Sequence, residues 1–252
     1  VRPHYPGLDG TSARALIASF LDREPGGGWL SLADAEALLS THGIPVALSY
    51  RCRELERALA VAQEIGGAVA LKADFAAAPN ASAIDAMLLG LEGESAVRSG
   101  WHELERRVQT AGQEWMGAIV QRHVAPGADT LVGAFSDPDL GSVIAVGLGG
   151  RQAGLGETIA CRLPPATDVE ADELIDSCHG VATELDGFRG AAPLDRQALR
   201  ELILRFALLL REVPEVVEAD LNPVRCTTDS SVVLAVRVRV ERRRPRERVK
   251  TW

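Results

Sequence analysis

The feature that most constrains the fold is a helical pattern that ends at glycine and is followed at once by a short apolar strand. Arg53–Ile65 is predicted to be a helix that stops at Gly66-Gly67, and Ala68–Lys72 is the strand after it. Earlier in the chain, Ser31 is placed to cap a helix that ends at Gly43, with an apolar face of Leu32, Ala35, Leu38 and Leu39. This alternation predicts an α/β or α+β layered fold.

The second half of the chain has a different texture, because short β-rich runs follow one another between turn residues. They indicate a largely antiparallel sheet and are Met116–Val120, Thr130–Phe135, Ser142–Leu148 and Thr158–Leu163. Helices are predicted at Ser12–Arg23, at Glu94–Gly112 with Trp101, Leu104 and Val108 inward, at Val169–Leu185 and at Leu194–Arg211. We also expect a loop or lid at Asp74–Ala86, a strand at Met87–Leu91, and a hairpin of Val216–Leu221 and Val232–Val240 across Asn222–Ser231.

The composition of the chain bears on which partners it can bind and in which compartment it is expected. The chain has 252 residues with 27 Lys or Arg against 35 Asp or Glu, a net charge of −8, which argues against nucleic acid as a main partner. No apolar run approaches the ~18–20 residues of a membrane span. The start at Val1, without an apolar signal core, suggests a segment of something longer. Four cysteines without a C-x-x-C pair suggest buried thiols in a reducing, cytoplasmic setting.

The segment Glu218-Ala219-Asp220-Leu221-Asn222-Pro223 is the best candidate for chemistry. Side chains alternate along a strand, so Glu218, Asp220 and Asn222 are expected to share one face. Three oxygen-bearing side chains on one face suit Mg²⁺. A solvated strand face that ends in an Asn-Pro turn explains the same residues equally well.

Two further segments could contact phosphate. Lys72 closes an apolar strand and could present its ammonium group to a phosphate, although a strand-end lysine that reaches solvent is the commoner case. The glycine cluster 147–156 could bring backbone N–H groups close to phosphate. It matches neither G-x-G-x-x-G, because Gln152 takes the last glycine position, nor the P-loop, so a tight strand connection is the simpler explanation.

Nucleophilic catalysis finds little support in the sequence. The five histidines are scattered, no G-x-S-x-G elbow is present, and Cys178 and His179 are expected on different faces of one helix.

Taken together and in order, these segments resemble the ATP-grasp module of ADP-forming acyl-CoA (acetyl-CoA) synthetases over roughly residues 29–241. The first matching stretches are Gly28-Trp29-Leu30-Ser31, Thr41-His42-Gly43-Ile44-Pro45, Ile65–Lys72, Ile119-Val120-Gln121, Pro126-Gly127 and Leu131-Val132-Gly133. The later ones are Asp137-Pro138, Gly147-Leu148-Gly149-Gly150, Phe188-Arg189-Gly190, Pro193-Leu194-Asp195 and Glu218–Val224.

The resemblance implies a two-lobed ATP-grasp fold of mixed and antiparallel sheets with flanking helices, which grips ATP and Mg²⁺. The implied nucleotide-binding residues are Lys72 at the phosphates, Val120 and Gln121 in the hinge against adenine, Asp129 in place of a usual glutamate, and Gly149 and Gly150. The implied metal ligands are Glu218 and Asn222. The implied organisation is an extension or linker at 1–29, the ATP-grasp domain at 30–241 and a basic tail at 242–252. Its lobes are 45–118 and 119–241, with helix 31–42 packing with them.

The implied reaction converts an acid, CoA and ATP to acyl-CoA, ADP and phosphate by way of a phosphorylated histidine and an acyl phosphate. CoA-binding and ligase-type domains, in some relatives with a GNAT acetyltransferase domain, would be partners on the same or another chain. Homo-oligomerisation is left open.

Several positions depart from the family pattern. The usual His-Lys-Ser-Asp-Val-Gly-Gly-Val is replaced by Asn80-Ala81-Ser82-Ala83-Ile84-Asp85-Ala86-Met87. Gly154 stands where a glutamate is expected, Thr158 at or near an acid position, and Arg237 where an aspartate would bind metal. An arginine there would repel a metal ion but could itself meet phosphate. These departures argue against turnover by the usual route, so the alternative is a catalytically degenerate module that senses nucleotide or serves as a scaffold.

Overall fold

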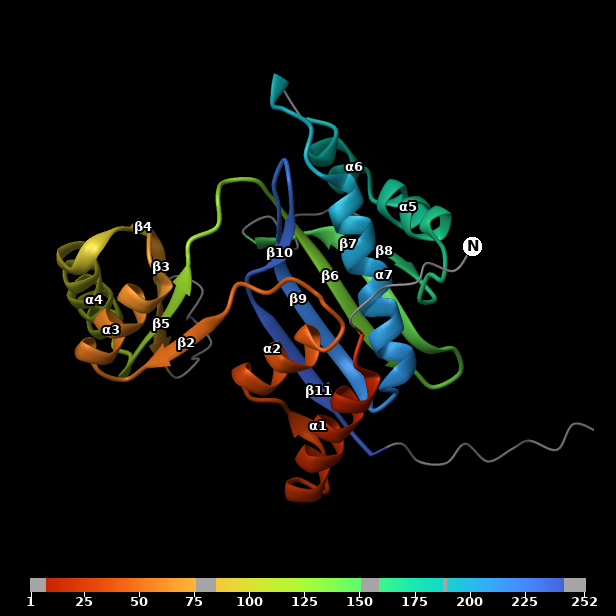
Figure 1. Ribbon diagram of the computed structural model, residues 1–252, viewed down its shortest axis with the longest axis horizontal. Helices are drawn as coiled ribbons and strands as arrows, with labels where there is room; N and C mark the ends of the chain where they lie inside the picture. Colours follow the sequence, from red (N-terminus) through yellow and green to blue (C-terminus); the bar gives the residue numbers. More distant parts are fainter. Residues whose placement is uncertain (1–7, 76–84, 151–158, 188–189, 243–252) are drawn as a thin grey trace, which may run out of the picture. The chain divides into compact units, whose positions relative to one another are not determined.

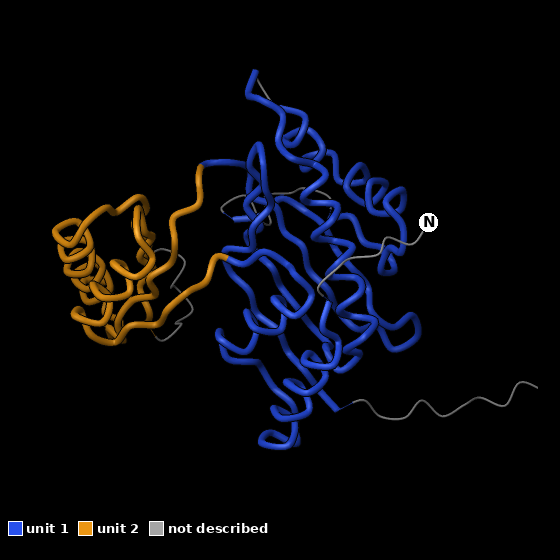
Figure 2. Tube along the Cα trace, in the orientation of Figure 1, with its two compact units in different colours: residues 1–46, 126–252 blue, residues 47–125 orange. Residues whose placement is uncertain are grey.

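The computed structural model describes residues 8–75, 85–150, 159–187 and 190–242. The chain divides into two compact units, a large unit of residues 1–46 with 126–252 and a small unit of residues 47–125 (Figure 2). The small unit is thus an insertion in the chain of the large one. Strand β5 (Trp115–Arg122), which the expected lobe boundary at 118/119 divides, lies wholly in the small unit. No helix of the described residues combines the length and apolar character that a membrane span requires.

The small unit has a four-stranded antiparallel sheet covered on one face by two helices (Figure 1). The strand order is β2 (Ser49–Cys52), β5, β3 (Val69–Phe75) and β4 (Met87–Leu91), and the helices are α3 (Leu55–Ile65) and α4 (Gly93–Thr110). Trp101, Leu104 and Val108 of α4 are buried, as predicted. Alternate strand residues, among them Leu71 and Val120, complete this core.

The large unit has a seven-stranded antiparallel sheet in the order β1-β11-β9-β6-β7-β8, with β10 also paired to β9. Its strands are β1 (Gly28–Trp29), β6 (Ala128–Asp137), β7 (Gly141–Leu148), β8 (Ala160–Arg162), β9 (Val216–Cys226), β10 (Ser231–Val233) and β11 (Val236–Val240). Its helices are α1 (Gly10–Arg23), α2 (Leu32–Ser40), α5 (Asp168–Ser177), α6 (His179–Leu185) and α7 (Arg196–Glu212).

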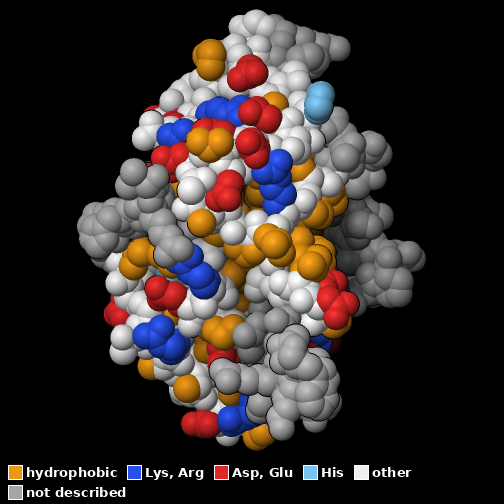
Figure 3. All heavy atoms as spheres, turned by 90° about the vertical axis from the view of Figure 1, so that its right-hand side faces the viewer, with side chains coloured by type: hydrophobic (Ala, Val, Ile, Leu, Met, Phe, Trp, Pro, Cys, Tyr) orange, Lys and Arg blue, Asp and Glu red, His pale blue; other side chains and the backbone are white. Residues whose placement is uncertain are grey.

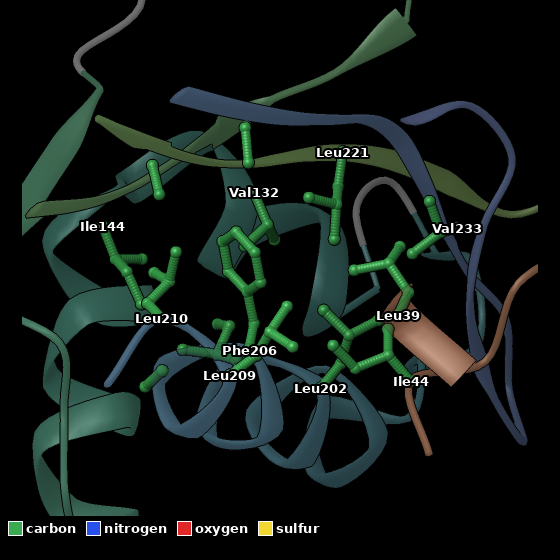
Figure 4. Close-up of a cluster of buried hydrophobic side chains, with 14 of the residues drawn as sticks. Leu39, Ile44, Val132, Ile144, Leu202, Phe206, Leu209, Leu210, Leu221 and Val233 are labelled. Atoms are coloured by element: carbon green, nitrogen blue, oxygen red, sulfur yellow. The ribbon is translucent and has the colours of Figure 1, made fainter. Parts of the chain in front are cut away.

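Helix α7 provides the centre of the large core. Phe206 of α7 is fully buried and points at the sheet beside Val132 and Leu221 (Figure 4). The face of the molecule seen in Figure 3 carries Lys and Arg side chains among Asp and Glu, with apolar side chains that adjoin one another across its middle.

The predicted C-terminal hairpin is confirmed in its pairing, because Val216–Leu221 lies antiparallel to β11, but the turn expected from Asn222 begins too early. Strand β9 continues through Asn222-Pro223 to Cys226 and pairs with β11, β6 and β10. The ladder with β6 shifts register between Thr130 and Val132, opposite Asn222-Pro223. A bulge of this kind accommodates a residue without a backbone N–H, so the proline does not end the strand.

Three other expectations need correction. Val169–Leu185 is two helices, because Cys178 has an extended backbone (φ −103°, ψ 90°) and separates α5 from α6. Cys178 and His179 therefore lie at a break and not on one helix. Strand β5 pairs in the small sheet and is not part of the meander of β6, β7 and β8. Cys161 is exposed, whereas Cys52, Cys178 and Cys226 are buried thiols as expected.

Buried His42 predicts a pH dependence of stability. Its Nδ1 lies 2.8 Å from Thr41 Oγ1, and its Nε2 lies 3.4 Å from Glu212 Oε2 without a hydrogen bond. Burial lowers the pKa of His42 below its ordinary 6.5, and the charge of Glu212 only partly opposes this. The unfolded chain then binds more protons than the folded one just below pH 6.5, so stability should fall as the pH drops through that value.

The measurement is urea unfolding of the large unit between pH 7.5 and 5.5. His42→Gln should flatten the pH dependence, whereas replacement of the exposed His102 by glutamine should leave it in place. Equal slopes for the wild type and His42→Gln would contradict the assignment.

Candidate functional site

Polar side chains gather on one face of the large sheet. Ala219 and Leu221 of β9 are buried in the core under α7, so Glu218, Asp220 and Asn222 project to the opposite side, as the alternation predicted. Val236 and Val238 of β11 are buried in the same way, which places Arg237 and Arg239 beside the β9 residues. We call this surface, made of Glu218, Asp220, Asn222, Arg237 and Arg239, the polar face.

Asn222 is joined to the start of the glycine-rich segment. The backbone N–H of Gly150 donates to Asn222 Oδ1 over 2.9 Å, and that of Gly149 donates to the Asp129 carbonyl over 2.8 Å. Gly150 has φ +59°, and a Cβ at Gly149 would lie 2.3 Å from the Thr130 carbonyl oxygen. Both positions therefore require glycine. The geometry holds a backbone N–H and the amide of Asn222 together at the end of β7.

Asp129 is engaged by an arginine that sequence reasoning missed. Arg225 Nε lies 2.5 Å from Asp129 Oδ1, and Nη2 lies 3.2 Å from Oδ2, so the pair is bidentate. The two residues are opposite one another in the β6–β9 ladder and are mostly buried. A nucleotide that meets Asp129 would thus meet a carboxylate whose charge is already balanced. No local pattern links residues 96 positions apart, so only the register of the sheet reveals the pair.

Asp220 is the most unusual acid on the polar face. Its Oδ1 is buried and has no hydrogen-bond partner among the described residues. Burial raises the pKa of Asp220, Arg237 opposes that shift, and Glu218 adds to it. Glu218 itself is half exposed, with one oxygen 3.5 Å from Arg239 Nε. Asp220 shared the predicted face but was not among the expected metal ligands, and its unpartnered oxygen makes it a better candidate than Glu218.

The donor set fits one Mg²⁺ whose shell is completed by phosphate. Among the described residues no three His, Cys, Asp or Glu side chains cluster as metal ligands. Asp220 supplies an unpartnered carboxylate oxygen, and Asn222 Oδ1 keeps a second lone pair beside its bond to Gly150. Mg²⁺ is commonly held by one or two protein oxygens together with substrate phosphates and water.

The small unit contains the remaining expected residues. Lys72 lies half buried in β3, opposite Ile119 of β5 and Met87 of β4. Gln121 is on the same face and is buried, and its Nε2 donates to the Ala47 carbonyl over 2.7 Å and to Ser49 Oγ over 2.6 Å.

The side chain of Val120 points the other way, into the core under α3 and α4. It could offer only its backbone to a ligand on the face that carries Lys72.

The expected residues thus form two groups. Lys72, Val120 and Gln121 belong to the small unit, whereas Asp129, Gly149, Gly150, Glu218 and Asn222 belong to the large one. That the groups meet on one nucleotide stays a prediction. The possible lid over 76–84, the departures at Gly154 and Thr158, the Phe188-Arg189 match and the tail from 243 fall outside the described residues.

A separate pocket of about 580 Å³ lies between α3 and α4 in the small unit. Its lining includes Leu59, Gly67, Leu91 and Val97 but none of the expected site residues. It is therefore distinct from the surfaces that carry Lys72 and the polar face.

The fold and the site define the class of the protein. The chain belongs to the ATP-grasp domain family, whose model matches residues 22–240. The resemblance drawn from the sequence and the mixed α/β, two-unit ATP-grasp fold are confirmed.

The particular relatives are ADP-forming acetate–CoA ligases. The chain is 31% identical over 230 residues to ligase I of Archaeoglobus fulgidus, covering 90% of this chain and 33% of that enzyme. It is 27% identical over 194 residues to the ligase II beta subunit of Pyrococcus furiosus, covering 76% of this chain and 82% of the subunit. The chain thus spans a third of the first relative and most of the second.

A solved structure supports the same assignment. Acetyl-coenzyme A synthetase 1 of Candidatus Korarchaeum cryptofilum, in complex with coenzyme A and Ca-AMPCP, superposes with a TM-score of 0.77 at 27% identity. The match covers 91% of this chain and 100% of that one. A second structure of this enzyme contains coenzyme A and Mg-AMPPCP, with its phosphohistidine segment pointing towards the nucleotide-binding site (TM-score 0.71, 26% identity).

Proposed function

We propose that the chain is the nucleotide-binding ATP-grasp domain of an ADP-forming acyl-CoA synthetase-like protein. In that role it binds Mg-ATP and takes part in phosphoryl transfer as an acid, CoA and ATP become acyl-CoA, ADP and phosphate. The observation that carries the proposal is the hydrogen bond from Gly150 N–H to Asn222 Oδ1. It joins a glycine-rich segment suited to phosphate to the strand that carries the candidate metal ligands.

Each candidate residue has a role that follows from its chemistry. Lys72 would contribute a point charge to a phosphate, and Gly149 and Gly150 allow the backbone to approach closely. Asp220 and Asn222 would hold Mg²⁺, which when bound neutralises phosphate charge during transfer. Glu218 is more exposed and would lie near the metal ion without belonging to the pair of residues that hold it. Gln121 would position the strand that borders adenine through its bonds to Ala47 and Ser49.

The partners are proposed on the same basis. The Pyrococcus relative is named a beta subunit, and the Korarchaeum structure contains coenzyme A and a phosphohistidine segment. We therefore expect CoA-binding and ligase-type domains on the same or a partner chain. A GNAT domain, a homo-oligomer and a cytoplasmic location stay predictions. The degenerate-module alternative gains no support over the enzyme, since the relatives are named as ligases.

Calorimetric titration with ATP, with and without Mg²⁺, tests the proposal. We expect binding that strengthens with Mg²⁺, and ADP release once the partner domains, an acid and CoA are added. Absence of heat with ATP under both conditions would overturn the proposal. Binding without ADP release in the complete mixture would favour the sensor or scaffold alternative.

A further inference from the structure

Arg237 lies in the middle of the polar face with unused hydrogen-bonding capacity. It is opposite Asp220 in the β9–β11 ladder and is exposed to solvent. Its strand neighbour Arg239 approaches Glu218 at 3.5 Å and Glu241 at 3.0 Å. Arg237, by contrast, forms no ion pair with any other residue that the structure describes.

Trp29 fixes the position of this guanidinium group. The Arg237 Cζ atom lies 4.4 Å from the centroid of the Trp29 ring, an arrangement that stabilises the cation from one side. The guanidinium group has five N–H donors, and the contact with the ring uses none of them in a hydrogen bond to a carboxylate. A planar donor fork that is held in place and has no carboxylate partner is well suited to a phosphate.

The charges of the polar face agree with an anionic ligand. Arg237 and Arg239 together balance Glu218 and Asp220, so the formal charge of these four side chains is zero. A face with only the two carboxylates would repel a nucleotide until divalent cations were bound. Here a fixed cation is already present next to Asp220.

We propose that Arg237 binds a phosphate group of the nucleotide and thereby makes nucleotide binding by this chain partly independent of Mg²⁺. This inference rests on the proposed function, because it concerns the same site. Trp29 is a positioning residue that holds the Arg237 guanidinium in place.

The test compares ATP affinity in Mg²⁺ and in EDTA for the wild type and the Arg237→Ala variant. Loss of one charge-assisted contact is expected to weaken binding in EDTA about 10-fold, with a smaller loss in excess Mg²⁺. The ATP affinity of Arg237→Lys in EDTA should lie between those of the wild type and Arg237→Ala, because lysine keeps the charge without the planar fork. Trp29→Leu should also weaken binding in EDTA. Arg211→Ala, which removes an exposed arginine of α7, is the matched control and should bind as the wild type does.

The outcomes separate the two proposals. A wild type that binds no ATP in either buffer removes the proposed function and this inference with it. If the wild type binds ATP, the ratio of its affinities in EDTA and in Mg²⁺ is the decisive quantity. The inference alone is overturned when Arg237→Ala and Arg237→Lys leave this ratio unchanged. Circular dichroism of each variant establishes that the fold is intact, which the exposure of Arg237 leads us to expect.

Discussion

Replacement of Asn222 by alanine is expected to weaken ATP binding in Mg²⁺ roughly 100-fold, because two functions of one side chain are lost. The amide oxygen holds the Gly150 N–H over 2.9 Å, and it is also a candidate ligand for Mg²⁺. Without it, the beginning of the glycine-rich segment loses its tether to β9 and Asp220 is left as the sole inner ligand of the pair. Calorimetry of the purified variant with ATP and Mg²⁺ measures the loss.

Asn222→Asp is the informative companion variant. A carboxylate at this position still accepts a hydrogen bond from Gly150 and remains an oxygen ligand, so we expect it to retain most of the affinity in Mg²⁺. In EDTA the added negative charge should weaken binding relative to the wild type. If the alanine variant bound ATP as tightly as the wild type, the Gly150–Asn222 bond would be a structural contact outside the site.

Replacement of Phe206 by alanine is expected to lower the free energy of unfolding of the large unit by about 3–5 kcal/mol. The ring is fully buried and lies between α7 and the sheet, where Val132 and Leu221 surround it (Figure 4). Truncation removes apolar burial and leaves a cavity that the rigid sheet cannot close. Urea unfolding followed by far-ultraviolet circular dichroism gives the value.

Phe135 offers a matched control in the same sheet. Its side chain is 46% exposed, so alanine there should change the free energy by no more than about 0.5 kcal/mol. The Trp101–Trp115 pair, with ring centroids 5.2 Å apart, lies in the small unit, so its fluorescence reports on that unit once Trp29 and Trp252 are replaced by phenylalanine. In the Phe206→Ala variant, the urea midpoint of this fluorescence signal can be compared with the midpoint of unfolding of the large unit. Equal midpoints would show that the two units unfold together.

The elements with local signals were predictable. The Ser31 hydroxyl accepts from the Asp34 N–H at the start of α2, and α3 ends at Gly66 with φ +66°, as the cap and stop residues indicated. Helix α4 buries Trp101 and Leu104 at helical spacing. These features depend on residues within one or two turns of each other, so a single sequence contains the information that specifies them.

The features that were missed depend on pairing between distant strands. Asn222-Pro223 is an ordinary turn signal, and only the bulge against β6 allows β9 to continue through it. The membership of β5 in the small sheet follows from its pairing with β2 and β3. The Asp129–Arg225 pair and the unpartnered oxygen of Asp220 likewise follow from register and depth in the sheet. Shared faces could be predicted from alternation, but the partners across the sheet could not.

The discontinuous large unit has a consequence for the order in which a nascent chain acquires structure. All residues of the small unit have left the ribosome once residue 125 has emerged. Strand β1 can pair only later, after β11 has been synthesised, because Trp29 pairs with Arg239. At ~5–20 residues per second this interval is on the order of ten seconds. During that time β1 lacks its partner strand, so the large unit is completed only after the small unit has its whole sequence available for folding.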